Sequence, residues 1–168
     1  MNLSWFLGGA PDAGWTNYAS LALASEGHGI DFYSLGLTIA GFGTLIAGIN
    51  FLVTIINMRA PGMTYMRMPL FTWTTFVASA LILFAFPPLT AGLAMLMLDR
   101  MFDTSFFNPE LGGNTIIWEH LFWIFGHPEV YIIILPAMGI VSEVMSVNAR
   151  KPIFGYMAMV GSLFAIAI

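Results

Sequence analysis

Two long stretches without a charged residue constrain this chain more than any other feature of its sequence. Residues 32–58 and 68–98 contain no aspartate, glutamate, lysine or arginine. Each stretch is longer than the roughly 20 residues that an α-helix needs to cross a hydrocarbon core about 30 Å thick. Charged residues make up 8% of the chain and hydrophobic residues 58%, which departs strongly from a soluble domain. We therefore predict a protein that lies in a lipid membrane.

Two further apolar stretches extend the prediction to four spanning helices. Helices satisfy their backbone hydrogen bonds within one segment, as a lipid environment requires. We therefore predict an all-α integral membrane protein with helices at about 30–58, 68–98, 116–148 and 153–168. The last stretch is still apolar at residue 168. We expect residues 1–168 to form a single membrane domain and to be a fragment of a longer polypeptide.

Small residues recur along the first predicted helix and permit close approach to neighbouring helices: Gly36, Ala40, Gly41, Gly43, Ala47 and Gly48. Gly43 and Ala47 are four residues apart, as are Ala40 and Thr44, and residues at this spacing share a helix face. Small residues in such positions allow membrane helices to approach closely. We expect this stripe to contact a neighbouring helix.

The basic residues predict the orientation in the membrane. Four of the five follow the first or the third predicted helix, namely Arg59, Arg67, Arg150 and Lys151. The positive-inside rule places these connections in the cytoplasm of a bacterium or in the mitochondrial matrix. We thus expect the bacterial plasma membrane or the mitochondrial inner membrane. The net charge of −4 gives no indication of nucleic-acid binding, and the absence of cysteine excludes disulfides and thiolate metal sites in this chain.

Three side chains that can exchange protons lie within the third predicted helix: His127, Glu129 and Tyr131. His127 and Tyr131 are i and i+4 on a helix, so their rings can meet. An ionised carboxylate at this depth costs several kcal/mol, about 3 on insertion scales. This cost favours a protonated Glu129 or one that faces an internal water cavity. Pro128 cannot donate to the carbonyl of Ile124, and Pro136 likewise frees that of Ile132, which predicts two kinks or loosened turns that bracket the group.

A structural role is the alternative for each of these residues taken alone. A histidine in a membrane helix can bond to a neighbouring helix, while Tyr131 and Trp123 can be ordinary core or interface aromatics. Together the residues predict a functional site, because an exchangeable carboxyl suits a proton relay. Imidazole suits copper, iron, nickel or zinc. One histidine does not complete a metal site, so we expect other ligands outside this chain.

The run WIFGHPEVY at residues 123–131 closely resembles the signature of subunit I of the heme-copper oxygen reductases. The similarity continues through AGINF at 47–51, NMRAPGM at 57–63 and KPIFGY at 151–156. The resemblance implies that the chain supplies four helices of a larger twelve-helix bundle. It also implies copper and two hemes in the full subunit, so the fragment alone is not expected to be active.

The resemblance implies a role for each residue of the candidate site. His127 matches a histidine ligand of copper, and Tyr131 matches a catalytic tyrosine that is covalently bonded to that histidine. Glu129 matches the carboxyl that passes protons toward the metal centre. Trp123 and Val130 match residues that line the oxygen approach to the metal pair, with simple packing as the alternative for both.

Three more positions match residues of the family's proton pathways. Asn50 and Thr44 match groups on the route that leads to Glu129. Ser142 matches a hydroxyl on the route that ends at Tyr131. Without the resemblance, helix contacts or hydrogen bonds to the backbone would explain Asn50, Thr44 and Ser142.

These matches predict part of the catalytic subunit of a proton-pumping terminal oxidase that reduces O2 to water. Cytochrome c is the expected electron donor, and the other oxidase subunits and membrane lipid are the expected partners. Tyr131 favours oxygen reduction over the nitric oxide reductase branch of the family, which lacks the crosslinked tyrosine. The alternatives are a quinol oxidase of the same family, a non-redox proton channel or transporter, and a nonfunctional truncated membrane protein.

Overall fold

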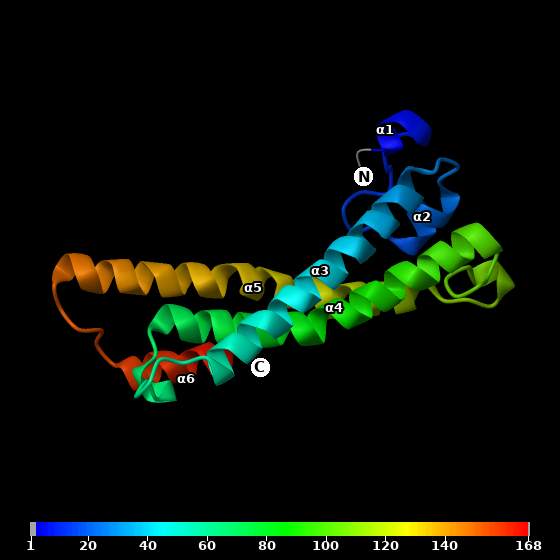
Figure 1. Ribbon diagram of the computed structural model, residues 1–168. Coiled ribbons are helices and arrows are strands. Elements are labelled where there is room, and N and C mark those ends of the chain that lie inside the picture. Colours follow the sequence, from blue (N-terminus) through cyan, green and yellow to red (C-terminus); the bar gives the residue numbers. More distant parts are fainter. Residues whose placement is uncertain (1–2, 168) are drawn as a thin grey trace. The chain divides into compact units, whose positions relative to one another are not determined.

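The computed structural model describes residues 3–167, and all regular secondary structure in this range is helical (Figure 1). The elements are α1 (Ser4–Leu7), α2 (Ala19–Ala24), α3 (Gly29–Asn57), η1 (Tyr65–Arg67), α4 (Leu70–Phe102), η2 (Pro109–Leu111), α5 (Thr115–Ala149) and α6 (Tyr156–Ala167). The prediction of an all-α integral membrane fold is confirmed.

Three of these helices are long and apolar enough to cross a membrane. α3, α4 and α5 contain 29, 33 and 35 residues, and all three are strongly apolar. At about 1.5 Å of rise per residue, each exceeds the thickness of a hydrocarbon core. α6 is a shorter apolar helix of 12 residues in the fourth predicted stretch. Residue 168, where that predicted stretch ends, lies outside the described residues.

Local chemistry explains the ends of the long helices. α5 begins at Thr115, and the side chain of Asn114 accepts the backbone N–H of Ile116 at 2.9 Å, as a capping residue does. Arg59 follows the end of α3 and donates to the carbonyls of Ile55 and Ile56 at 3.0 and 2.7 Å. These two bonds satisfy acceptors that the helix leaves open at its C-terminus.

The prolines do not end the helices that contain them. α4 continues through Pro87 and Pro88, and α5 continues through Pro128 and Pro136. Membrane helices tolerate proline where local adjustment satisfies the freed carbonyls again. His127, Glu129 and Tyr131 consequently lie on one uninterrupted helix.

The contacts divide the described residues into two compact units. Unit 1 contains residues 3–43 and 86–126, and unit 2 contains residues 44–85 and 127–167. Each of the three long helices contributes one part to each unit. That residues 1–168 form a single membrane domain stays a prediction.

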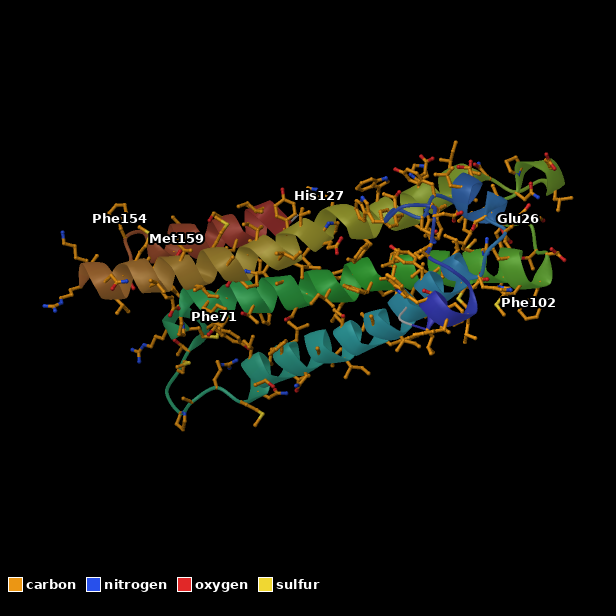
Figure 2. The ribbon with its side chains drawn as sticks, turned by 90° about the horizontal axis from the view of Figure 1, so that it is seen from above. Glu26, Phe71, Phe102, His127, Phe154 and Met159 are labelled. Carbon is orange, nitrogen blue, oxygen red and sulfur yellow. The ribbon has the colours of Figure 1, made fainter. Side chains whose placement is uncertain are left out.

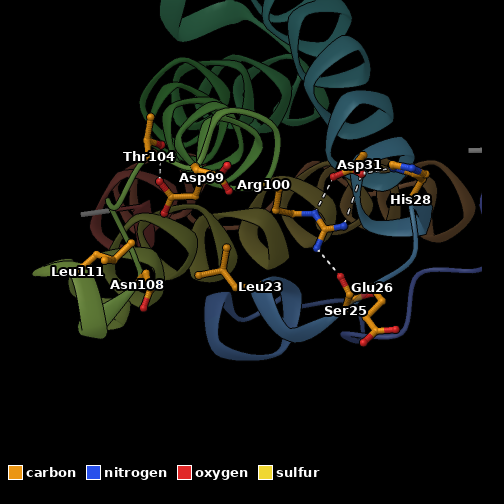
Figure 3. Close-up of a pocket in the computed structure, with 11 residues that line it drawn as sticks. Leu23, Ser25, Glu26, His28, Asp31, Asp99, Arg100, Thr104, Asn108 and Leu111 are labelled. Carbon is orange, nitrogen blue, oxygen red and sulfur yellow. Dashed lines mark hydrogen bonds and ion pairs between the residues drawn. The ribbon is translucent and has the colours of Figure 1, made fainter.

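Arg100, near the end of α4, is the centre of a hydrogen-bond network in unit 1 (Figure 3). We call the region of this network, residues 22–31 and 99–107, the polar end of unit 1. The Nε of Arg100 donates to Asp31 at 2.6 Å. Its two Nη atoms donate to the other oxygen of Asp31 and to the carbonyls of Ala22, Ser25 and Gly27. All five N–H groups of the guanidinium therefore have an acceptor. The bonds tie α4 to α2, to the start of α3 and to the connection between them.

Asp99, the neighbour of Arg100, organises the loop after α4. One carboxylate oxygen accepts from the Thr104 hydroxyl at 2.5 Å and from the backbone N–H of Phe106 at 2.9 Å. The other accepts from the N–H of Phe107 at 2.8 Å. A polar pocket of about 340 Å³ lies between this loop and the Arg100 network. Hydrogen bonds to backbone and side-chain donors thus explain why this acid is buried.

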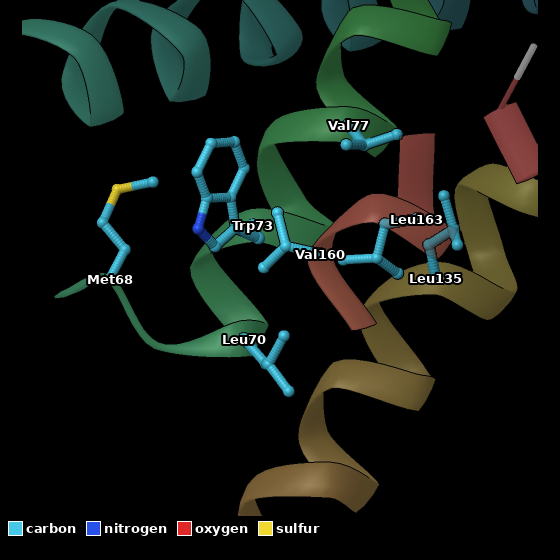
Figure 4. Packing of buried hydrophobic residues seen from close by; sticks show 7 residues of the cluster. All are labelled: Met68, Leu70, Trp73, Val77, Leu135, Val160 and Leu163. Carbon is cyan, nitrogen blue, oxygen red and sulfur yellow. The ribbon is translucent and has the colours of Figure 1, made fainter. Parts of the chain in front are cut away.

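The core of unit 2 is an apolar cluster from α4, α5, α6 and the residues before α4 (Figure 4). Its buried members are Met68, Leu70, Trp73, Val77, Leu135, Val160 and Leu163. The indole N–H of Trp73 donates to the Tyr156 hydroxyl at 3.0 Å, and that hydroxyl donates to the carbonyl of Met68 at 2.6 Å. Burial of apolar surface and these two polar contacts fix α6 against α4.

Gly41 and Gly48, two of the small residues predicted to allow close approach, lie at close contacts between α3 and α4. In unit 1, a Cβ placed on Gly41 would lie 3.4 Å from the Phe86 ring. In unit 2, a Cβ on Gly48 would lie 3.0 Å from the Ile82 side chain. Gly43 and Ala47, from the predicted stripe, are exposed in the part of the chain described here. The helices thus meet on a neighbouring face of α3.

Candidate functional site

His127 and Tyr131 form a ring pair on α5 (Figure 2 labels His127). Their ring centroids are 4.5 Å apart and their planes are inclined by 78°, an edge-to-face contact. The spacing of four residues explains the contact, because it places the second side chain one turn above the first. The imidazole is exposed and the phenol is half-buried. The structure therefore brings together the two residues that the sequence predicted to meet.

Glu129 does not share the face of this pair. Two residues along a helix correspond to a rotation of about 200°, so its carboxyl leaves α5 on nearly the opposite side from His127. Glu129 is half-buried, and its neighbour Val130 is 52% exposed. The sequence placed the histidine, the carboxyl and the phenol in one group, whereas the helix separates the carboxyl from the ring pair.

Trp123 belongs to unit 1, where it contacts the loop before α2. Its indole N–H donates to the Tyr18 hydroxyl at 3.3 Å. The Trp15 ring meets it edge-on, with centroids 6.1 Å apart. The indole is nevertheless 45% exposed. Trp123 is thus held on one side and accessible on the other.

The residues predicted for proton transfer lie in unit 2. On α3, Thr44 is half-buried and Asn50 is exposed. On α5, the Ser142 hydroxyl donates to the carbonyl of Met138 at 2.8 Å. Ser142 also borders a cavity of about 60 Å³ whose lining includes the hydroxyl-bearing residues Thr74 and Ser162. Proton transfer at these positions stays a prediction.

The described part of the chain contains few side chains of the types that bind metal ions. Within residues 3–167, no group of three or more His, Cys, Asp or Glu side chains could hold one. His28 is bonded to Asp31 at 3.0 Å in unit 1. His127 offers an exposed imidazole, a suitable single ligand for a copper ion. That His127 supplies one ligand to a copper site stays a prediction.

Sequence reasoning missed the network around Arg100 and Asp31. The available signal was their position, since Asp31 lies at the start of one predicted span and Arg100 follows the end of the next. Two such residues fall on the same side of a membrane in an antiparallel pair of helices. Opposite charges at such positions are candidates for a pair.

Comparison with known proteins assigns the family. All 168 residues, 1–168, match the family model described as Cytochrome C and Quinol oxidase polypeptide I. The chain belongs to this family. The match confirms the resemblance inferred from WIFGHPEVY and the other runs.

Several bacterial members of the cytochrome c and quinol oxidase family are similar to the chain. Cytochrome c oxidase subunit 1 of Bacillus subtilis (strain 168) is 80% identical over 100% of this chain and 26% of the relative. Cytochrome c oxidase subunit 1 of Bacillus sp. (strain PS3) is 70% identical over 99% of this chain and 27% of the relative. Quinol oxidase subunit 1 of Bacillus subtilis (strain 168) is 58% identical over 99% of this chain and 26% of the relative. The chain spans about a quarter of the length of the curated relatives it matches.

Membership of this oxidase family has two direct consequences. It implies heme and copper as cofactors. Together with the long apolar helices, the bacterial relatives identify an integral protein of the bacterial plasma membrane.

Proposed function

We propose that this chain is part of the catalytic subunit of a proton-pumping terminal oxidase, which reduces O2 to water at a heme-copper centre. The observation that carries the proposal is the ring contact between His127 and Tyr131 at 4.5 Å. It places an imidazole and a phenol side by side on a chain whose family uses heme and copper. The complete subunit contains a copper ion and two hemes in this proposal, and this chain alone is inactive.

His127 is the one copper ligand supplied by this chain. Its exposed imidazole can bind a metal held by further ligands from the remainder of the subunit. Copper, when bound, supplies one-electron redox chemistry and Lewis acidity. The ring contact with Tyr131 restricts the orientation of the imidazole, as a supporting group does for a metal ligand.

Tyr131 and Glu129 move protons in this proposal. The phenol of Tyr131 can donate a proton, and an electron with it, to the reacting oxygen. The carboxyl of Glu129 can exchange a proton with water from another side of the helix. Because α5 separates the two groups by rotation, they suit two different delivery routes. Thr44 and Asn50 belong to the route toward Glu129, and Ser142 belongs to the route toward Tyr131.

Trp123 and Val130 line the approach of O2. Both side chains are mainly apolar and about half exposed, at 45% and 52%. Such surfaces favour the passage of an apolar gas over that of ions. The remainder of the subunit, the other oxidase subunits and membrane lipid cover the other exposed faces of the three long helices.

Cytochrome c is the proposed electron donor. The 80% and 70% identities belong to cytochrome c oxidase subunits, whereas the quinol oxidase subunit is 58% identical. Quinol is the second candidate because that identity is still high. The test is oxygen uptake by the purified native complex, supplied with reduced cytochrome c or with a quinol. Uptake with cytochrome c alone supports the proposal, uptake with quinol alone changes the donor, and a heme-free complex without uptake contradicts an oxidase.

A further inference from the structure

The loop at residues 13–18, which we call the tryptophan loop, receives two indole N–H groups from α5. Trp118 donates to the carbonyl of Thr16 at 3.2 Å, and Trp123 donates to the Tyr18 hydroxyl at 3.3 Å. The Trp15 ring adds an edge contact with Trp123 at 6.1 Å. The position of the Trp123 indole therefore depends on where this loop lies.

Two side-chain contacts tie the tryptophan loop to α3. The Tyr33 hydroxyl donates to the carbonyl of Trp15 at 2.6 Å. The Asn17 amide donates to the Ser34 hydroxyl at 3.4 Å, a long bond. Asn17 has a φ of 48°, a left-handed conformation that asparagine adopts more readily than most residues. Asn17 and Ser34 are both 0% exposed.

The amide oxygen of Asn17 is buried without a donor among the described residues. Turning the amide by 180° does not solve the problem, because the Ser34 hydroxyl would then face the oxygen and the NH₂ group would lose its acceptor. Buried polar groups in native proteins are bonded to protein or to ordered water, and an orphaned one is costly. The site therefore requires a partner.

We propose that a buried water molecule binds to the Asn17 amide oxygen beside Ser34 and completes the hydrogen bonding between the tryptophan loop and α3. Water can donate to the amide oxygen and also accept from a neighbouring hydroxyl. Asn17 and Ser34 are both neutral, so a neutral ligand suits the site better than a buried ion. Asn17 is then a positioning residue for the indole of Trp123.

The water site stands independently of the proposed oxidase function. Only its consequence, control of oxygen entry past Trp123, rests on that function. The two claims are therefore tested by different measurements on the same purified native complex.

The first measurement is a density map of the complex at a resolution that shows ordered water. We expect one water at about 2.7–3.2 Å from the Asn17 amide oxygen. A protein or cofactor group in that place, or an empty site walled by apolar atoms, overturns the proposal. The same map of the Asn17→Gly variant serves as a control, because glycine keeps the left-handed backbone and removes the amide. The water should then be lost or displaced.

The second measurement is the recombination of carbon monoxide with the reduced complex after a light flash. We expect Asn17→Gly to change the rate at least twofold at unchanged heme content. An unchanged rate in Asn17→Gly overturns the positioning role even if the water is present. A complex that binds no carbon monoxide contradicts the oxidase function and leaves the map to decide on the water.

Discussion

The imidazole of His127 and the phenol of Tyr131 meet edge-to-face on one side of α5, with centroids 4.5 Å apart and planes inclined by 78°. The contact follows from their separation by four residues on a continuous helix. The contact places an imidazole, which can bind a metal ion, next to a phenol, which can donate a proton. This relationship makes the roles of the two rings separable by mutation.

Tyr131→Phe should retain the ring contact and remove only the hydroxyl. We expect bound copper to be unchanged and oxygen uptake to fall by about 100-fold or more, since a positioned proton donor contributes that much. Metal analysis and oxygen uptake on the purified complex test this. Uptake at the parental rate would show that the phenol has no catalytic role.

His127→Ala should have a different signature, because it removes a proposed metal ligand. Copper content and oxygen uptake should both be lost. Heme content and the helical circular dichroism signal serve as controls for folding. Full copper occupancy with normal uptake would rule out His127 as a ligand.

Glu129→Gln should leave the fold and the metals intact, because the amide has nearly the same size as the carboxyl. Turnover should fall by about 100-fold, since the amide cannot transfer the proton. Glu119→Gln is the matched control, an exposed carboxyl on the same helix. Equal effects of the two changes, or proton pumping at the parental rate in Glu129→Gln, would remove Glu129 from the proton route.

Arg100→Lys should destabilise the polar end of unit 1 although the charge is kept. Lysine has three donors on one nitrogen and cannot reproduce the five-donor fork that reaches Asp31 and three carbonyls. We expect a loss of about 1–3 kcal/mol in the free energy of unfolding, the cost of losing several charge-assisted hydrogen bonds to partly buried acceptors. Thermal unfolding of the purified complex measures it. Arg67→Lys at an exposed position is the control, and an equal shift in both variants would argue against the fork.

Gly139→Ala should destabilise the crossing of α4 and α5 in unit 2. A Cβ at this position would collide with the Thr74 hydroxyl and lie 2.9 Å from the Cα of Phe71. Overpacking of this kind costs about 1–3 kcal/mol. Gly43→Ala is the matched control, since its Cβ meets no described atom within 4 Å. Thermal unfolding of the two variants should therefore differ, and equal midpoints would contradict the close crossing.

Helix positions were predictable because predominantly apolar stretches of sufficient length have few alternatives in lipid. The four predicted ranges therefore correspond to α3, α4, α5 and α6, with ends shifted by local capping at residues such as Asn114 and Arg59. The contact face of α3 was not predictable in the same way. Glycines at 41, 43 and 48 look equivalent in sequence, and only the position of α4 shows that Gly41 and Gly48 make the contacts.

In the candidate site, too, contacts within one helix could be predicted from the sequence, whereas contacts between distant segments could not. Contact between His127 and Tyr131 could be predicted, because a spacing of four residues is a property of one helix. The separation of Glu129 from that pair is equally local and follows from the rotation per residue. The tryptophan loop could not be predicted, since Trp123 and Tyr18 are 105 residues apart and their contact depends on how distant segments pack.

The sequence by itself determined the membrane setting, the helical class, the family and the ring pair on α5. These properties depend on hydropathy, motif and helical periodicity, which act over short distances along the chain. Only the tertiary structure decided how Arg100 meets Asp31, which glycines allow close helix contact, and that Asn17 is buried with an amide oxygen that has no donor among the described residues. These contacts join segments far apart in sequence, so their free energies depend on packing that no local pattern specifies.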